Sequence, residues 1–394
     1  MKSPGRILII PSWYPPDGGY FFKEHSEAIL GMGWQVDVLV NRVVGIRKVL
    51  QIGWSALRGY RVGNENGLRV IRSIYLKLPG NEKQNIQRWA AGTARLYRKY
   101  EKSYGKPDLI LSHSVTWAGY AASLINNLYG IPYLVVEHRS FFVWSTEKAR
   151  SMVKSYYLPF FEEAYRNCSR LVLVSGSLLT GLKELIPWIE EKTMTIPNMI
   201  REDMFLPPSV VRSTEPFVFL WAGRLEHVKG VDLLIEAARI LKEHGKDNFF
   251  IRLAGKGSLR NVLDQQAAAA GVSDVVHFLG RISRDEMQKE MQMANCFVLP
   301  TRYEAFGAVL IEAMATGLPV IATRSGGPDT IVNNENGILI NIENSEQLAA
   351  AMEDMIHRIK EFSEQQIRKQ TMDRYGQNSV MKQYNELFLQ LLTE

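Results

Sequence analysis

Short apolar runs alternate with amphipathic helical patterns along most of the 394-residue chain, and this alternation restricts the fold more than any other feature. Apolar strands separated by helices predict parallel sheets with helices on both faces. The runs fall into two sets, which predicts two doubly wound α/β domains in a chain longer than one core usually supports. The predicted strands are 6–10, 35–40, 108–112, 133–136 and 171–175, then 217–222, 249–254, 275–279, 296–299 and 319–322.

A break in the pattern separates the two sets of strands. It lies between Pro197 and Pro216, where several prolines interrupt any regular element. We therefore expect one domain over residues 1–205 and a second over 206–375. The chain is helical in pattern from about Glu343, and its last segment, 376–394, has one apolar face formed by Val380, Tyr384, Leu387 and Leu391.

The composition excludes several classes of protein. No apolar stretch reaches the roughly 18 residues of a membrane-spanning helix, and the run from Ile7 to Ile10 is too short for a signal peptide. Cys168 and Cys296 lie far apart without paired ligand spacing, which excludes a disulfide scaffold and a cysteine zinc site. We expect a cytoplasmic protein with two buried thiols.

Positive charge is concentrated in one part of the first domain. Residues 41–106 contain 15 Lys and Arg against 3 Glu, so this stretch carries +12 in a chain whose total is +6. Apolar residues interleave with the basic ones, and the stretch could lie on an anionic membrane surface. It could equally be a solvated loop and helix face that covers the core. Nucleic acid is not expected, because no recognisable reader module accompanies the charge.

The loop after the strand 217–222 carries two cations on a glycine-bounded turn. Arg224 follows Gly223, and Lys229 precedes Gly230, after which a helix is predicted. Arginine offers a bidentate fork, lysine a compact charge, and a helix N-terminus free N–H groups, so the loop suits a diphosphate. A solvated loop with incidental basic residues explains this segment alone equally well.

A second glycine turn, Gly255-Lys256-Gly257, follows the strand 249–254. The motif is weak by itself because tight turns need glycine anyway. Its position is more informative, since parallel sheets bind ligands at the ends of strands near a topological switch.

Two carboxylates follow in the segment 303–322. Glu312 stands in an otherwise apolar helical stretch, where it needs hydrogen-bond donors. A ribose diol would supply them, and a neighbouring arginine or backbone amide would do so equally well. Glu304 precedes the helix, whose first N–H groups could meet an anion or sugar hydroxyls. It could equally be a first-turn glutamate favoured by the helix dipole.

Gly223-Arg224 with Lys229-Gly230, followed by Glu304 and Glu312 with seven residues between them, resembles the GT4 family of retaining glycosyltransferases. The likeness extends over essentially the whole chain. It implies the α/β GT-B fold, in which two Rossmann-like domains face each other across a cleft. The first domain would bind the acceptor and the second the nucleotide-sugar donor, and the C-terminal helix would cross back onto the first domain.

The resemblance also implies roles for individual residues. Arg224 and Lys229 would hold the donor diphosphate, and Glu312 would take the ribose hydroxyls. Glu304 would contact the transferred sugar, and the segment 276–282 is similar to the one whose backbone reads the nucleobase. The donor-binding residues implied in this way are Gly19, Gly223, Arg224, Lys229, Gly255, Arg281, Ile282, Ala305, Phe306, Gly307, Ala308, Val309 and Glu312.

The N-terminal half agrees with the resemblance. The pair Gly18-Gly19 after the first strand resembles the family's first loop, where backbone amides approach the donor phosphate and the acceptor. His138, at the end of the strand 133–136, matches the family's active-site histidine. Gly18 and His113 are candidates on the acceptor side. Without the resemblance, a satisfied core histidine would be the better explanation of His138.

These features predict an enzyme of the hexosyltransferase type. It would move a sugar from a nucleotide-diphosphate donor, with a UDP-sugar favoured over a GDP-sugar, to a hydroxyl of a glycan or lipid-linked glycan. His138 and Glu304 would be the catalytic residues. No D-x-D triplet occurs, so we expect neither a metal nor another cofactor.

Three alternatives remain at this point. A nucleotide-sugar epimerase and a glycan phosphorylase share the fold, and a non-catalytic sugar-binding relative would also keep it. A dehydrogenase is disfavoured, because no G-x-G-x-x-G follows the first strand. We expect the protein in the cytoplasm, with peripheral contact to the inner face of the membrane if residues 41–106 bind lipid.

Overall fold

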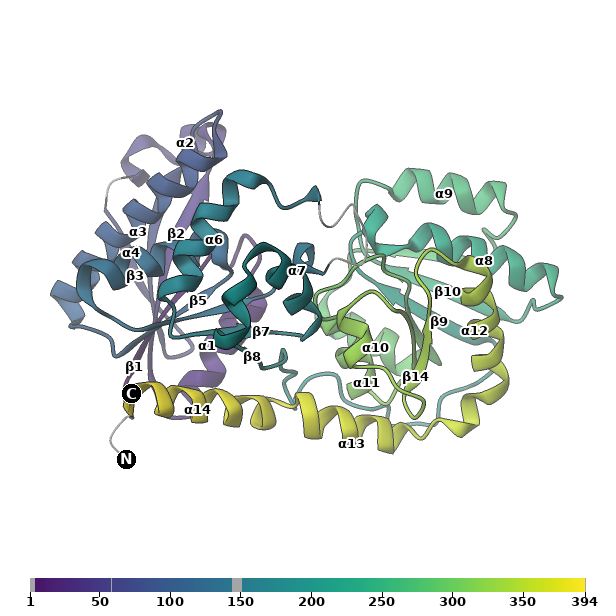
Figure 1. Cartoon of the computed structure of the whole chain (residues 1–394). Helices are drawn as coiled ribbons and strands as arrows, with labels where there is room; N and C mark the ends of the chain where they lie inside the picture. The colour runs from purple at the N-terminus through teal and green to yellow at the C-terminus, as the bar shows by residue number, and fades with distance from the viewer. Residues whose placement is uncertain (1–3, 58, 144–150, 394) are drawn as a thin grey trace.

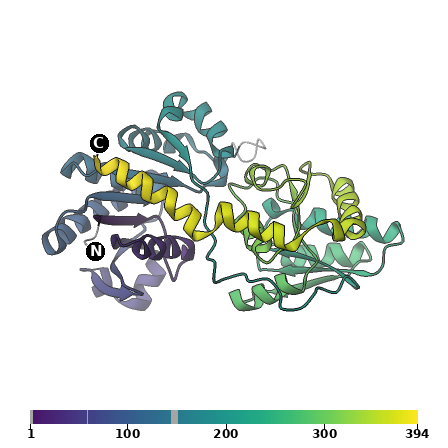
Figure 2. The same ribbon diagram turned by 90° about the horizontal axis from the view of Figure 1, so that it is seen from below.

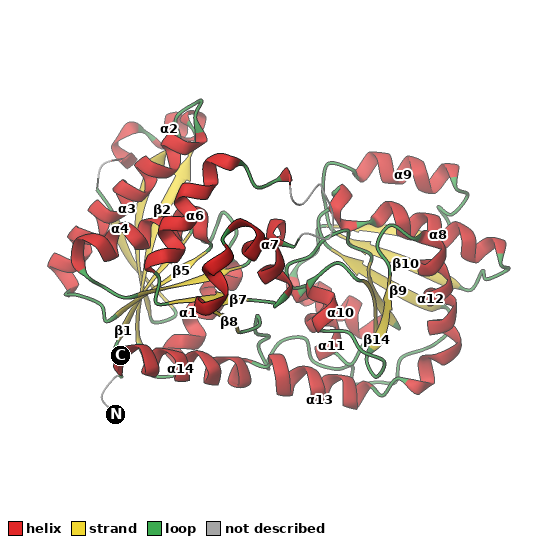
Figure 3. Ribbon diagram, in the orientation of Figure 1, coloured by secondary structure: helices red, strands yellow, loops and turns green. Residues whose placement is uncertain are grey.

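The computed structural model describes residues 4–57, 59–143 and 151–393. Its strands form two separate sheets, each with helices on both faces (Figures 1 and 3). The first sheet has the order β3-β4-β2-β1-β5-β6-β7-β8, and the second has the order β11-β10-β9-β12-β13-β14. The pairs are parallel except β3 with β4. The predicted pair of doubly wound α/β sheets is confirmed.

The N-terminal half contains the first sheet and its helices. Its strands are β1 (Arg6–Pro11), β2 (Gln35–Val44), β3 (Arg61–Glu65), β4 (Leu68–Leu76), β5 (Leu109–His113), β6 (Tyr133–Glu137), β7 (Arg170–Leu173) and β8 (Thr193–Thr195). Its helices are α1 (Tyr20–Gly31), α2 (Ile46–Ile52), α3 (Glu82–Tyr104), α4 (Tyr120–Tyr129), α6 (Leu158–Asn167) and α7 (Ser177–Leu185).

The C-terminal half contains the second sheet. Its strands are β9 (Phe217–Ala222), β10 (Phe249–Ala254), β11 (Val276–Gly280), β12 (Cys296–Leu299), β13 (Val320–Thr323) and β14 (Gly337–Ile340). Its helices are α8 (Val231–Glu243), α9 (Arg260–Ala269), α10 (Arg284–Met293), α11 (Ala308–Ala315), α12 (Ser345–Arg358) and α13 (Glu364–Tyr375), and α14 (Gln377–Thr393) follows.

Every predicted strand is present, although β2 continues further than expected, to Val44. Four further strands, β3, β4, β8 and β14, are not among those predicted from the sequence. Of these, β3 lies at a sheet edge with exposed side chains and therefore lacks apolar alternation, and β8 has only three residues. The turn between β3 and β4 is Asn66-Gly67, with φ of 52° and 89°. Asn-Gly is a strong hairpin signal, and it could have located both strands.

The basic stretch 41–106 includes this hairpin and has more regular structure than predicted. The stretch is not one loop and helix face, because it contains the end of β2, α2, both hairpin strands and α3. Four of its cations, Arg42, Arg69, Arg72 and Lys77, form ion pairs with acidic residues of the same half. Arg58 lies outside the described residues.

The last two helices run along both halves of the molecule (Figure 2). Helix α13 packs against α11, and after Gly376 the helix α14 lies against α1 of the first half. There Trp34 Nε1 donates to Asn385 Oδ1 at 2.9 Å, and its ring meets Phe388 edge-on. The chain connects the two halves once after β8 and again at Gly376. These two connections are joined, since Gln377 N donates to Ile200 O at 2.9 Å.

Each sheet has a point where the winding direction reverses. In the first sheet this switch lies between β1 and β5, and in the second it lies between β9 and β12. The loops that leave neighbouring strands at a switch turn to opposite sides and leave a crevice at the carboxyl ends. Both switch points carry residues that the sequence singles out.

Candidate active site

The loops after β9 and β12 meet at the switch point of the second sheet. Lys229 lies on the first loop and Glu304 on the second, and Lys229 Nζ is 2.6 Å from Glu304 Oε2. Both side chains are mostly buried, with exposed fractions of 21% and 17%. The fold thus brings together two residues that belong to separate sequence motifs.

Glu304 is held in its ionised form. Burial acts to raise the pKa of this carboxyl, but the charge and hydrogen bond of Lys229 outweigh it, so the pKa lies below its ordinary value. The amides of Phe306 and Ala305 lower it further. Glu304 can therefore accept hydrogen bonds from a ligand, but it is not a proton donor near neutral pH.

Arg224 lies on the same loop as Lys229 but points elsewhere. Its Nη1 donates to Glu226 Oε1 at 2.7 Å, and its side chain is 73% exposed. Burial raises the pKa of Tyr303, and the charges of Lys229 and Arg224 both oppose this, so the two cations lie around one tyrosine. Glu226, which holds Arg224 in this structure, is not among the residues singled out from the sequence.

Close backbone contacts fix the position of these loops. Gly230 has φ of 66°, and a Cβ there would lie 1.9 Å from Pro300 O. A Cβ at Gly255 would lie 1.8 Å from Gly223 O. No side chain fits at either position, so the loops after β9, β10 and β12 touch backbone to backbone. These backbone contacts hold in place the loop that carries Lys229.

The predicted nucleobase segment continues the same edge of the sheet. Gly255 N donates to Gly280 O at 2.7 Å, which joins the turn after β10 to the end of β11. Arg281 and Ile282 follow directly, the first exposed and the second partly buried. The turn after β10 therefore joins the loop that carries Arg224 and Lys229 to the predicted nucleobase segment.

Helix α11 begins beside Glu304 without a side-chain cap. It starts after Gly307, whose φ is 94°. Ala305 and Phe306 are buried, Ala308 is exposed and Val309 is partly exposed. An uncapped N-terminus carries unsatisfied N–H groups and a partial positive charge, which suits an anion. Two more helices without a side-chain cap begin at switch-point loops, α1 at Gly19 and α8 at Gly230.

Glu312 lies on α11 and is partly buried, and no residue in the described part of the chain forms a hydrogen bond or ion pair with it. Burial raises the pKa of Glu312 to about 7, opposed by the charge of Arg284 and assisted by that of Glu24. Arg284 does not satisfy this carboxylate, because its guanidinium donates to both oxygens of Glu24 in α1. The side chain thus remains available for a ligand's donors.

In the first half, Gly18 and Gly19 link β1 to α1. Gly19 has φ of 71°, and a Cβ there would lie 2.5 Å from Trp13 O, so the turn folds tightly on itself. In the same loop, Ser12 donates from its amide and its hydroxyl to His113 O, at 3.3 and 2.8 Å. The loops after β1 and β5 therefore meet at the first switch point.

His138 follows β6 directly and contacts His113. The His138 Nε2 to His113 Nδ1 distance is 3.1 Å, and His113 Nε2 lies 3.4 Å from Nδ1 of a third histidine, His25 in α1. His138 is partly exposed, whereas His113 is wholly buried behind it. A direct contact of His113 with an acceptor would need its neighbours to move, so its burial does not favour the predicted acceptor-side role.

Glu137 is a further buried group that the sequence analysis leaves without a role. Its carboxylate accepts hydrogen bonds from the amides of Val115, His138 and Arg139 at 3.0, 2.9 and 2.9 Å and from the Tyr165 hydroxyl at 3.3 Å. It therefore joins the loop after β5 to the loop after β6. A charged residue inside an apolar strand, next to a singled-out histidine, was the available signal.

The segments that carry His138 and Glu304 meet between the halves. Gly327 N donates to Glu304 O at 2.8 Å. A Cβ at the preceding Gly326 would lie 2.3 Å from Val143 Cγ1, and Val143 follows the short turn after His138. Both predicted catalytic residues thus lie on segments that touch across the interface.

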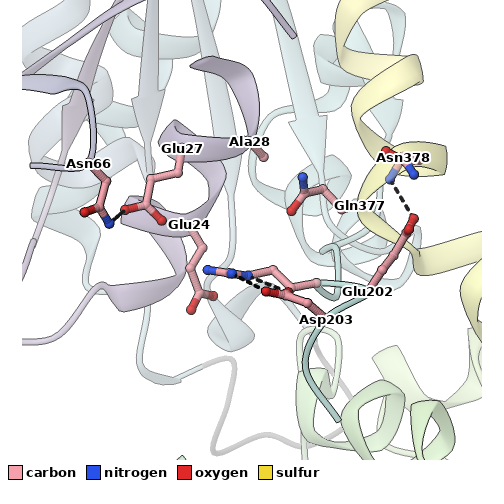
Figure 4. A pocket seen from close by; sticks show the side chains of 9 residues that line it. Glu24, Glu27, Ala28, Asn66, Glu202, Asp203, Gln377 and Asn378 are labelled. Carbon is pink, nitrogen blue, oxygen red and sulfur yellow. Dashed lines mark hydrogen bonds and ion pairs between the residues drawn. The ribbon is translucent and has the colours of Figure 1, made fainter. Parts of the chain in front are cut away.

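Among the described residues, cavities line this interface at two places. One of about 350 Å³ is lined by Ser175 and Pro197 from the first half and by Phe306 and Tyr375 from the second. The other, of about 470 Å³, lies between α1 and the two segments that connect the halves, residues 201–203 and 377–378 (Figure 4). Most of its polar groups pair with one another, as in Asn66 with Glu27, Glu202 with Asn378 and Arg201 with Asp203. None of the predicted donor-binding residues lines this second cavity.

The residues that the structure describes contain no group of three or more His, Cys, Asp or Glu side chains arranged to hold a metal ion. Within them, no helix combines the length and the apolar character needed to cross a membrane.

Comparison with protein families decides the classification. The profile described as Glycosyltransferase Family 4 matches residues 19–203, and the profile described as Glycosyl transferases group 1 matches residues 205–373. The chain belongs to the GT4 glycosyltransferases. It is an enzyme of the hexosyltransferase type with the GT-B fold, as the motifs in both halves predict.

Individual relatives agree with this assignment. An uncharacterized glycosyltransferase of Methanocaldococcus jannaschii is 26% identical over 404 residues, which cover 96% of each chain. The structure of sucrose-phosphate synthase from Thermosynechococcus elongatus matches this GT4 enzyme with a TM-score of 0.79 at 19% identity, over 98% of this chain and 99% of that one. Anabaena HepE, in complex with UDP and glucose, matches with a TM-score of 0.74 at 18% identity and the same coverage.

Proposed function

We propose that this GT4 enzyme transfers a sugar from a nucleoside diphosphate, UDP in the first place and GDP in the second, with retention of anomeric configuration. The acceptor is a hydroxyl of a glycan or lipid-linked glycan. The observation that carries the proposal is the Lys229–Glu304 pair at a switch point, beside the uncapped start of α11 and the partnerless Glu312. The UDP complex of the similarly folded HepE supports UDP as the carrier.

Each part of the donor has a matching group along this edge. The diphosphate takes Lys229, Arg224 and the first amides of α11, and these positive groups stabilise its charge as it leaves without a metal. The ribose hydroxyls donate to Glu312, and the base lies against the segment that contains Arg281 and Ile282.

The transferred sugar lies between the two halves in this proposal. Its hydroxyls donate to the ionised Glu304, while His138 contacts it from the first half. Neither residue forms a covalent bond to the sugar, and the acceptor attacks on the face from which the diphosphate departs. Closure of the halves keeps water from the donor.

Thermal unfolding with UDP, GDP, ADP and TDP, each with and without a chelator, tests the donor site. One diphosphate at about 100 times its dissociation constant should stabilise the chain by about 2.7 kcal/mol. The shift should persist with chelator, be smaller in Glu312→Gln and remain unchanged in Glu386→Gln, a change on the exposed face of α14. No shift with any diphosphate would contradict the nucleotide-sugar proposal. Release of the diphosphate only when an acceptor is present would separate a transferase from an epimerase.

We also propose that α2 touches an anionic membrane and brings a lipid-linked acceptor toward the site. The helix exposes Ile46 (41%) and Leu50 (65%), and Trp54 (56%) follows it. Arg47 and Lys48, both exposed, flank these apolar groups. Because α2 follows β2, it lies at the carboxyl edge of the sheet, where the site loops also emerge (Figure 1). Interleaved apolar and basic side chains suit an anionic bilayer surface.

Co-sedimentation with lipid vesicles tests this surface. The chain should bind vesicles that contain phosphatidylglycerol and should not bind pure phosphatidylcholine. Leu50→Glu should abolish binding, whereas Leu128→Glu on α4, where the native leucine is 68% exposed, should not. Equal loss in both variants, or no binding to anionic vesicles, would contradict the membrane contact.

A further inference from the structure

Three histidines from three elements form a continuous chain of ring-to-ring contacts. His25 Nδ1 lies 3.4 Å from His113 Nε2, and His113 Nδ1 lies 3.1 Å from His138 Nε2. His25 and His113 are buried, and His138 is partly exposed at the end of β6. Two ring nitrogens are not used inside this chain, His25 Nε2 at one end and His138 Nδ1 at the other.

Burial favours the neutral form of all three rings. Burial lowers the pKa of His25 and of His138 to about 3, and it lowers that of His113 well below the ordinary value. The surroundings are aromatic, and no acidic side chain of the described residues forms a hydrogen bond or ion pair with these rings. Phe22 stacks on His113 at 4.3 Å, Phe21 lies edge-on to His138 at 5.1 Å, and Tyr384 of α14 lies edge-on to His25 at 4.5 Å.

Neutral rings restrict the chain to two arrangements of protons. A neutral imidazole has one N–H donor and one bare acceptor nitrogen, and each contact needs one of each. In the first arrangement His138 donates to His113, which donates to His25, and an N–H is left at His25 Nε2. In the second, His25 donates to His113, which donates to His138, and the N–H emerges at His138 Nδ1.

Two observations favour the second arrangement. His25 Nε2 is buried and has no partner among the described residues, and an unpaired buried N–H is rarer than an unpaired acceptor. At the other end, His138 is partly exposed, and its Nδ1 is not among the buried atoms of the described residues that lack a partner. An N–H placed there by the second arrangement can therefore meet solvent or a ligand.

We propose that His113, itself oriented by His25, is a positioning residue that holds His138 in the Nδ1–H tautomer. His138 then offers a hydrogen-bond donor at Nδ1 and has its bare nitrogen covered by His113. Such a ring can donate to an oxygen of the sugar or phosphate, but it has no open nitrogen with which to take a proton from the acceptor. The catalytic consequence rests on the proposed function, whereas the tautomer does not.

Histidine-selective ¹⁵N labelling of the whole chain tests the tautomer directly. Long-range ¹H–¹⁵N spectra distinguish the Nδ1–H, Nε2–H and doubly protonated forms, and single substitutions assign the signals. We expect His25, His113 and His138 all to show the Nδ1–H pattern at every pH from about 5 to about 8. An Nε2–H or protonated His138 would overturn the proposal. This measurement needs no substrate, so it stands even if sugar transfer is disproved.

Two substitutions of His113 test its positioning role. His113→Phe keeps a ring for Phe22 to stack on but removes the donor to His138. We expect the Nε2–H form of His138 to appear and kcat to fall about ten- to a hundredfold, as is typical when a partner that orients a functional ring is lost. KM for the donor should change less.

His113→Asn is the matched variant, because its amide N–H₂ lies near the position of Nδ1. It should keep His138 in the Nδ1–H form and recover most of the lost kcat. If His113→Phe leaves the tautomer of His138 unchanged, or if His113→Asn loses as much kcat as His113→Phe, the positioning role is wrong. A wild-type chain inactive with every donor would contradict the proposed function and leave the tautomer result intact.

Discussion

Arg284 in α10 donates to both carboxylate oxygens of Glu24 in α1, and this ion pair joins the two halves of the molecule. Its two charges act on Glu312 in opposite directions. The pair therefore lies beside the proposed ribose site and also forms a contact across the interface. A ligand that reaches Glu312 therefore comes close to a contact between the halves.

Reversing one charge of this pair should open the molecule. Arg284→Glu places a carboxylate near Glu24 and Glu312, and like charges in a partly buried site repel. We expect a larger radius of gyration in small-angle X-ray scattering and weaker nucleotide binding. Combining it with Glu24→Arg restores an attractive pair and should reverse both effects. Arg239→Glu, which breaks pairs within α8 only, is the control. An unchanged radius in Arg284→Glu would show that the pair does not hold the halves.

Lys229 and Arg224, the two cations of the proposed diphosphate loop, should contribute unequally to nucleotide affinity. Lys229 is mostly buried against Glu304, whereas Arg224 is largely exposed, so solvent screens Arg224 more strongly. Lys229→Met should weaken nucleoside diphosphate binding by about tenfold or more, the usual loss for a hydrogen bond to a charged group. Arg224→Met should cost clearly less. Isothermal titration calorimetry with the best-binding diphosphate measures both, and the reverse order would refute this ranking.

Glu312 should make stability depend on pH in an unusual direction. Its folded pKa of about 7 exceeds the ordinary value of 4.5, so between these values the folded chain keeps a proton that the unfolded chain has lost. Its contribution to stability therefore falls as pH rises through this window, by at most about 3 kcal/mol. Relative to wild type, Glu312→Gln should be more stable at pH 8 and should gain little at pH 4.5. Urea unfolding at both values checks this, and a gain of equal size at the two pH values would contradict it.

The same carboxylate should couple nucleotide binding to proton release. Ribose hydroxyls donate to the ionised form, so affinity should rise as pH increases toward and past 7. Calorimetry at pH 6.5 in buffers of different ionisation enthalpy should detect protons released on binding. Glu312→Gln should release none from this site. If wild type and variant release the same number of protons, Glu312 is not the group that meets the ligand.

A single methyl group at Gly230 should displace the diphosphate loop. Gly230→Ala combines a left-handed backbone with a Cβ 1.9 Å from Pro300 O, whereas Gly245→Ala, at φ of 74°, meets nothing within 4 Å. The control should cost about 1 kcal/mol from backbone strain alone. Gly230→Ala should cost at least about 2 kcal/mol more and should also weaken diphosphate binding. Chemical denaturation of both variants measures the difference, and equal costs would mean that the loop yields without strain.

Local sequence patterns predict most of the strands in both sheets. Apolar runs placed the strands of both cores, since buried parallel strands must be apolar on both faces. The edge strand β3 is not predicted, because its side chains are exposed and the apolar pattern comes from buried residues. Only Asn66-Gly67 indicates its turn. Lys229 and Glu304 were found because each lies in a recognisable local motif.

The partners of these residues could not be found in the same way. Glu24 and Arg284 are 260 residues apart, and nothing near either of them in the sequence marks a pair. His25 lies on α1 without a motif, and only the pairing of β1 with β5 brings it against His113. A contact between residues far apart in the sequence has no local sequence signal. The loops around Lys229 and Glu304, in contrast, contain glycines and charged residues that a local motif can identify.

The path of α14 has a consequence for the order in which the enzyme matures on the ribosome. Tyr384 and Phe388 cover His25 and Trp34, yet they are translated only after the entire second sheet. The first sheet to be synthesised is therefore covered on this side only after α14 has left the exit tunnel. Until then, His25 and Trp34 lack these two aromatic contacts.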